Sequence, residues 1–318
     1  MIWEESFISK KAFLFQGVGS NDTEKSLAVL NEEEMKRFFK LCERASKHTK
    51  LDIKKFISDS SSLSGLDSIF ADWIIASLCD CTVYETLLSK GITPDYVAGY
   101  SVGLNNVCYC TGSITLEDSL ELLRGGILSI IELQKNSVKY GMGVIIGLDY
   151  ETVADLISHN SSFERVTISS ENSDTFIVIS GFFSDIETIL KKSAEEGAIK
   201  IIPLDVPCAF HSSLMNDYAD GYFANASAIS YKDSRIPIVS IYDQKEIFSG
   251  EDIKKELLRN YVEPMKWKQT VKYMEDAGVT EFWDMSTLAA VKKASRLTNK
   301  ESTFKTIKSL RLSGGLQS

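Results

Sequence analysis

The segment from Tyr140 to Val206 most constrains the fold, because its strand and helix patterns occur in the order β-α-β-β-α-β. Strand-like and helix-like runs alternate over residues 141–148, 151–160, 165–172, 175–181, 184–197 and 198–206. This order is typical of a small ferredoxin-like α+β unit, and about 70 residues are enough for an independent folding unit. We therefore predict an inserted ferredoxin-like subdomain over residues 139–206.

The rest of the chain alternates short apolar strands with longer helical patterns. We predict strands at residues 12–15, 95–98, 236–240 and 279–285, and helices at residues 31–48, 67–89, 102–110 and 251–276. Such alternation is typical of a parallel sheet covered by helices on both faces. We therefore expect residues 1–138 and 207–318 to form one larger α/β unit around the insertion.

Composition excludes several classes of protein. The 318 residues carry a formal charge of -9, which argues against general nucleic-acid binding. The N-terminal sequence lacks the pattern of a signal peptide, and no apolar run reaches the roughly 18 residues of a membrane span. We expect a cytoplasmic protein with no nucleic-acid partner and no membrane association.

The cysteines do not suggest a metal site. They lie at positions 42, 79, 81, 108, 110 and 208, and the two C-x-C pairs do not match the spacing of common zinc sites. Only three histidines accompany them. We expect reduced, mostly buried thiols and no bound metal.

A G-x-S-x-G motif, Gly99-Tyr100-Ser101-Val102-Gly103, lies between a predicted strand and a predicted helix. In this context the turn holds the serine in a strained, exposed position, and glycines stand where side chains would clash. The backbone N–H of Val102 would lie at a helix N-terminus, where it suits an anionic intermediate. Ser101 is therefore a candidate nucleophile, and the alternative is a serine in a structural turn.

A nucleophilic serine needs an adjacent base, which is usually histidine at neutral pH. His48 lies in a segment rich in lysine and arginine, and His159 lies at the polar end of a predicted helix. His211 instead follows the last strand of the predicted subdomain, where a cleft is expected. His211 is the candidate base, and the alternative is a histidine that caps the following helix.

Several further motifs occur in order along the chain. They are FQGVGS at 15–20, GYSVG at 99–103, GSITLED at 112–118, GMG at 141–143, NS at 172–173 with VISG at 178–181, CAFH at 208–211, and Asn260 with Pro264 and Trp267. Together they resemble the malonyl-CoA:acyl carrier protein transacylase family, in particular free-standing or excised acyltransferases of polyketide synthases. The resemblance spans residues 12 to about 296. It implies an α/β hydrolase-like parallel-sheet domain with an inserted ferredoxin-like α+β subdomain.

The resemblance also implies a role for each matching residue. Ser101 would carry the acyl group, His211 would be general base and acid, and Asn260 would orient His211 through its backbone carbonyl. The backbone N–H groups of Val18 and Val102 would form the oxyanion hole. The implied substrate-binding residues are Gly17, Tyr100, Gly126, Asn172 and Phe210. No cofactor is implied, because a thioester of CoA or of carrier-protein phosphopantetheine is itself the substrate.

Three departures from the family pattern leave this chemistry in place. Tyr100 replaces a histidine that is not the base in this family, so catalysis does not depend on it. Val18 replaces a glutamine whose backbone N–H group, and not its side chain, would bind the oxyanion. The segment 285–289 stands where the family has G-P-G-K, which would reshape the cleft.

A fourth departure concerns the acyl group. Family members that transfer carboxyacyl groups bind the substrate carboxylate with an arginine 25 residues after the nucleophile, and this position is Gly126 here. Arg124 lies two residues earlier, so on a helix it points about 200° away from the required direction. Loss of the arginine should cost about 2 to 5 kcal/mol of carboxylate binding.

We therefore expect an acyltransferase that moves a small acyl or malonyl-type unit from CoA or an acyl carrier protein, through acyl-Ser101, to an acyl carrier protein in polyketide biosynthesis. Phe210 would narrow the pocket beside the acyl group. One alternative is an editing thioesterase of the same fold, in which water attacks the acyl-serine. A second alternative is an inactive module that docks carrier proteins.

Overall fold

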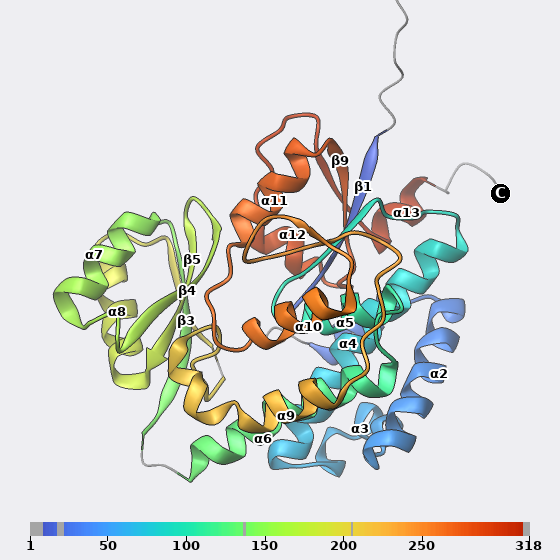
Figure 1. The fold of residues 1–318 in the computed structure, drawn as a ribbon, viewed down its shortest axis with the longest axis horizontal. Helices are drawn as coiled ribbons and strands as arrows, with labels where there is room; N and C mark the ends of the chain where they lie inside the picture. Colours follow the sequence, from blue (N-terminus) through green and yellow to red (C-terminus); the bar gives the residue numbers. More distant parts are fainter. Residues whose placement is uncertain (1–8, 18–21, 136–137, 205, 314–318) are drawn as a thin grey trace, which may run out of the picture.

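The computed structural model describes residues 9–17, 22–135, 138–204 and 206–313. The larger of its two sheets has the strand order β10-β9-β1-β2-β7-β8, and Figure 1 labels its neighbouring strands β1 and β9. Its strands are β1 (Lys10–Phe15), β2 (Tyr96–Gly99), β7 (Ile238–Val239), β8 (Glu246–Ile247), β9 (Val279–Asp284) and β10 (Thr303–Thr306). All of its strand pairs are parallel except β7 with β8. The predicted parallel sheet is confirmed, with one antiparallel strand at its edge.

Helices cover both faces of this sheet. Successive residues of β1 point to opposite sides of the sheet, so each face of the strand packs into its own core. Phe13 and Phe15 pack into one apolar core, and Ala12 and Leu14 pack into another. The first core is built with α1 (Thr23–Leu27), α2 (Glu32–Thr49), α3 (Ile53–Ser58), α4 (Gly65–Ser89), α5 (Gly103–Cys110), α6 (Leu116–Gln134), α9 (Asp220–Ala228), α10 (Gly250–Arg259) and α13 (Ile307–Ser313). The second core includes α11 (Trp267–Asp276) and α12 (Ala290–Ala294).

The smaller sheet is antiparallel and has the order β4-β5-β3-β6. Its strands are β3 (Tyr140–Ile146), β4 (Val166–Ser173), β5 (Phe176–Phe182) and β6 (Lys200–Leu204), and its helices are α7 (Tyr150–Asn160) and α8 (Phe183–Glu195). The two helices pack on one face and form a separate core. The other face presents Met142, Val144 and Val178, which contact Phe210 of the following loop. The predicted β-α-β-β-α-β order is confirmed.

The structure corrects one predicted element. The pattern predicted a continuous helix over residues 251–276, but α10 ends at Arg259 and α11 begins at Trp267. Pro264 lies between them, and proline interrupts a helix because it lacks an N–H group and restricts the preceding residue. The break leaves Asn260 at the end of α10.

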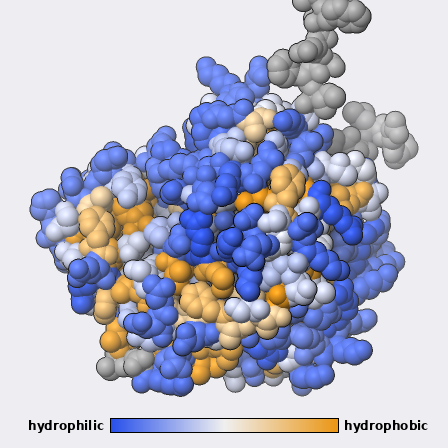
Figure 2. Space-filling view, in the orientation of Figure 1, coloured by the Kyte–Doolittle hydropathy of each residue, from blue (hydrophilic) through white to orange (hydrophobic). Residues whose placement is uncertain are grey.

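The outer surface is mainly polar. Figure 2 shows hydrophilic side chains over most of one face, with apolar side chains gathered low on it over α9. Within the described ranges, no helix combines the length and apolar character needed to cross a membrane. Five of the six cysteines are buried and all six are free thiols, as predicted.

Candidate active site

Ser101 occupies a sharp turn between β2 and α5. Its φ of 55° lies in the left-handed region, which residues other than glycine rarely adopt. Gly99 and Gly103 are required by close packing: a Cβ on Gly99 would lie 2.2 Å from the Leu104 nitrogen, and one on Gly103 would lie 2.4 Å from the Phe15 oxygen. The turn therefore presses the end of β1 against the start of α5 and fixes the serine between them.

His211 is the residue that the structure brings to Ser101. The Nε2 atom of His211 lies 2.8 Å from the Ser101 Oγ atom, and only 4% of the histidine is exposed. Its backbone is also left-handed, with a φ of 59°, and its N–H donates to the Tyr261 carbonyl at 3.1 Å. The other two histidines lie elsewhere: His48 contacts Glu121, and His159 is exposed at the end of α7.

Burial lowers the pKa of His211 to about 4, and the backbone of Asn260 opposes this shift. Within the described residues, the second ring nitrogen, Nδ1, has no hydrogen bond of acceptable geometry. The ring is therefore neutral at pH 7. A neutral imidazole at this distance can accept the Ser101 hydroxyl proton.

Asn260 contacts the serine rather than the histidine ring with its side chain. Its Nδ2 donates to the Ser101 carbonyl at 2.9 Å, and its Oδ1 accepts from the Tyr242 hydroxyl at 3.2 Å. The motif resemblance implied only a backbone contact between Asn260 and His211. The side-chain contact ties the end of α10 to the strained turn.

The end of β1 approaches the other side of the nucleophile. A Cβ on Gly17 would lie 3.1 Å from the Ser101 Cβ, so a larger residue would crowd the serine. The preceding Gln16 is held by Asp80, whose carboxylate accepts from its backbone N–H at 3.0 Å and from its Nε2 at 2.9 Å. Val18, the other predicted donor to the oxyanion, lies outside the described residues.

Asp80 was not predicted as a site residue. It is fully buried in α4, and burial raises the pKa of its carboxyl well above the usual range. One signal was present in the sequence, because a single acidic residue interrupts the apolar run from Trp73 to Cys81. Buried polar groups of this kind need partners, and here the partner is the end of β1.

Val102 is the N-cap residue of α5. The first N–H groups of a helix have no partner within the helix, and the helix dipole favours negative charge near them. The Val102 N–H group is thus available beside Ser101 for an oxyanion.

Ser101 and His211 lie at the base of a cleft of about 170 Å³ between the two sheets. Its walls are mostly apolar and come from the free face of the small sheet and from α12. The polar groups include the Tyr100 hydroxyl, which accepts from Asn172 Nδ2 at 3.2 Å, while the Tyr100 ring packs edge-on against Trp267. This arrangement suits a largely uncharged ligand.

A second, smaller pocket of about 40 Å³ opens behind the same pair. Ser101, His211 and Phe210 line both cavities, whereas Gly126 lines only the smaller one. The described residues around the two cavities include no lysine, arginine, aspartate or glutamate. The smaller cavity is referred to below as the inner pocket.

Comparison with known proteins defines the family. The model of the acyl transferase domain matches residues 12–317, which is nearly the whole chain. The chain belongs to the acyl transferase domain family. This confirms the predicted enzyme class, an acyltransferase, and it agrees with a serine–histidine pair at the base of a cleft.

Individual relatives of this acyl transferase domain are distant. Malonyl CoA-acyl carrier protein transacylase of Bacillus subtilis is 28% identical over 86% of each chain. The corresponding Synechocystis protein is 26% identical over 63% of this chain and 65% of its own length. The polyketide biosynthesis protein ThaF of Burkholderia thailandensis is 26% identical over 61% of this chain, which spans only 16% of ThaF.

Solved structures confirm the predicted α/β fold of this acyl transferase domain. A malonyl-transacylase in complex with a type II polyketide synthase acyl-carrier protein superposes with a TM-score of 0.82 at 22% identity. The superposition covers 96% of this chain and 100% of that one.

Proposed function

We propose that the protein transfers a short acyl group from a phosphopantetheine thioester to the thiol of an acyl carrier protein, through an acyl-Ser101 intermediate. The observation that carries this proposal is the 2.8 Å contact between Ser101 Oγ and a buried, neutral His211 at the base of an apolar cleft. An inactive docking module would have no need to maintain two strained residues in this contact.

In the first half-reaction, Ser101 Oγ attacks the thioester carbonyl carbon while His211 Nε2 takes its proton. The resulting oxyanion would accept hydrogen bonds from the backbone N–H groups of Val102 and Val18. The C–S bond then breaks, the acyl group remains as an ester on Ser101, and the leaving sulfur receives the proton from His211.

The second half-reaction reverses these roles. The carrier thiol gives its proton to His211 and attacks the acyl-serine carbonyl carbon. The ester C–O bond breaks and Ser101 regains the proton, so that the enzyme returns to its initial state. Because donor and acceptor present the same phosphopantetheine arm, one cleft serves both half-reactions.

We assign the acceptor and the biosynthetic setting from the relatives. Malonyl transacylases act with acyl carrier proteins by name, and both ThaF and the superposed complex belong to polyketide biosynthesis. The Cys208-Ala209-Phe210-His211 motif, which resembles that of polyketide acyltransferases, supports the same setting. CoA and a second carrier protein remain the two candidate donors.

The test is transfer to a purified carrier protein. Donor and phosphopantetheinylated carrier are mixed with the protein, and the carrier mass is followed over time. We expect the acyl mass to appear on the carrier, and the rate to fall by about 10²- to 10⁴-fold in His211→Ala. Release of free acid with no carrier acylation would overturn transfer and establish an acyl hydrolase of the same fold.

A further inference from the structure

The inner pocket is the part of the site that would hold the acyl group. The main cleft is the larger of the two cavities and has mostly apolar walls, so we expect it to receive the phosphopantetheine arm and the acyl group of acyl-Ser101 to turn towards the other cavity. With about 40 Å³, the inner pocket is much smaller than the cleft. What closes this pocket therefore decides which acyl groups react.

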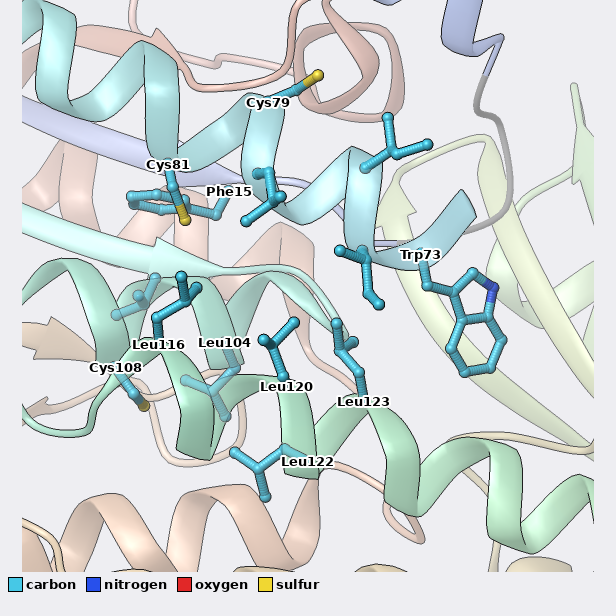
Figure 3. Packing of buried hydrophobic residues seen from close by; sticks show 14 of the residues in the cluster. Phe15, Trp73, Cys79, Cys81, Leu104, Cys108, Leu116, Leu120, Leu122 and Leu123 are labelled. Atoms are coloured by element: carbon cyan, nitrogen blue, oxygen red, sulfur yellow. The ribbon is translucent and has the colours of Figure 1, made fainter. Parts of the chain in front are cut away.

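Trp73 of α4 lines the pocket beside Gly126. A Cβ on Gly126 of α6 would lie 2.9 Å from the Trp73 Cζ3 atom, so the indole already fills the space beside the glycine. The indole also packs edge-on against Phe210, with ring centroids 6.4 Å apart, and only 7% of Trp73 is exposed. Figure 3 shows the Trp73 side chain extending from α4 towards α6, beyond Leu123.

None of the described residues that line the inner pocket is a lysine or an arginine, so no cation is present there to pair with a charged acyl group. Arg124, the nearest arginine on α6, lies over the Phe70 ring at 5.4 Å and pairs with Glu121 at 3.3 Å. It does not line the pocket. A carboxylate moved from water into such a cavity would lose its hydration without gaining a cationic partner.

We propose that Trp73 determines acyl specificity, because its indole closes the inner pocket to long acyl groups and occupies the space that a carboxylate and its cationic partner would need. The preferred substrate class is then a short, uncharged acyl thioester such as an acetyl thioester. This inference rests on the proposed function, since it requires an acyl-Ser101 intermediate.

The test compares acyl donors that share one leaving group. Acetyl-, butyryl-, hexanoyl- and malonyl-pantetheine are each mixed with the protein, and the rate of Ser101 acylation is followed by intact mass spectrometry. We expect the wild-type protein to prefer acetyl over hexanoyl and over malonyl by about tenfold or more. In Trp73→Ala, we expect butyryl and hexanoyl acylation to rise relative to acetyl by about tenfold.

Two variants keep the result interpretable. Trp73→Phe should give an intermediate chain-length profile even if Trp73→Ala folds poorly. Trp267→Phe is the matched control, because Trp267 lines the main cleft and not the inner pocket, and it should leave the chain-length ratio unchanged.

A carboxylate can be tested with the same donors. Gly126→Arg alone should not gain malonyl acylation, because the new side chain meets the Trp73 indole. The double variant Trp73→Ala with Gly126→Arg should gain malonyl acylation over both single variants, since guanidinium pairs well with carboxylate.

An unchanged chain-length ratio in Trp73→Ala and Trp73→Phe would overturn the role of Trp73 while leaving acyl transfer intact. Equal acylation of the wild-type protein by malonyl- and acetyl-pantetheine would overturn the exclusion of carboxylates. Absence of a Ser101 adduct from every donor would instead contradict the proposed function itself.

Discussion

At the scale of single residues, contacts with neighbouring groups hold Ser101 and His211 in strained backbone conformations. Ser101 and His211 both have positive φ angles, and such residues cost about 1 to 3 kcal/mol each. The contacts that hold them are the Asn260 side chain on the Ser101 carbonyl and the Tyr261 carbonyl on the His211 N–H group. The 2.8 Å contact is thus formed before any substrate binds.

The pH dependence of acylation should report the burial of His211. Burial lowers its pKa to about 4, from an ordinary value of 6.5, and only the neutral ring can accept the Ser101 proton. We therefore expect kcat/KM for acylation to be constant from about pH 5 to pH 8 and to fall as the pH drops through about 4. Quenched-flow mass spectrometry with acetyl-pantetheine measures this profile, and a midpoint near 6.5 would contradict the proposed environment.

At the scale of elements, the turn between β2 and α5 depends on the close approach of β1. The approach is possible because neither Gly99 nor Gly103 carries a Cβ atom. The end of β1 is in turn fastened to α4 through Gln16 and Asp80. The position of Ser101 therefore depends on β1 and α4 as well as on β2 and α5, the two elements that flank it.

Gly99→Ala should damage both the fold and the activity. Its Cβ would lie 2.2 Å from the Leu104 backbone nitrogen, which cannot move without displacing α5. We expect the free energy of unfolding in urea to fall by about 3 kcal/mol and Ser101 acylation to be lost.

Gly141→Ala in β3 provides the control for this variant. Its Cβ would lie 3.1 Å from a ring carbon of Phe183, a half-exposed side chain that can move. We expect a smaller loss of stability and retained acylation. Equal effects of the two substitutions would refute the claim that the turn depends on backbone proximity.

The sequence predicted the elements better than their contacts. The order of strands and helices follows from local apolar patterns, and the turn around Ser101 follows from its two flanking glycines. The break after Asn260 was missed because the residues on both sides of Pro264 have a helical pattern, so the pattern alone shows no interruption. The approach of Trp73 to Gly126 could not be predicted, since it depends on how α4 and α6 pack across 53 residues of chain, from position 73 to position 126.

At the scale of the whole molecule, charge is distributed unevenly. The chain has a formal charge of -9, yet residues 285–300 contain four basic and no acidic residues. These are Lys292, Lys293, Arg296 and Lys300, and all four are exposed. Lys292 and Lys293 lie on α12, whose Ala290, Val291 and Ala294 line the cleft, and the other two residues follow this helix. A basic segment therefore lies beside the cleft.

Reversing this charge should weaken carrier binding without changing the chemistry. For Lys292→Glu combined with Lys293→Glu, we expect KM for the carrier to rise about tenfold and wild-type sensitivity to salt to be lost, because exposed charges act mainly on association. Acylation by acetyl-pantetheine should stay constant. The matched control is Lys36→Glu with Lys40→Glu on α2, which lies away from the cleft; an equal effect there would show that only net charge matters.

The central claim is that Ser101 carries the acyl group, and the most direct test is the mass of the intact protein after brief exposure to acetyl-pantetheine. We expect one added acetyl group in the wild-type protein, located by peptide mapping to Ser101. We expect no addition in Ser101→Ala, which should keep the wild-type fold because the strained backbone and the cleft walls are unchanged. An acetyl adduct that persists in Ser101→Ala, or that maps to another residue of the wild-type protein, would contradict the account.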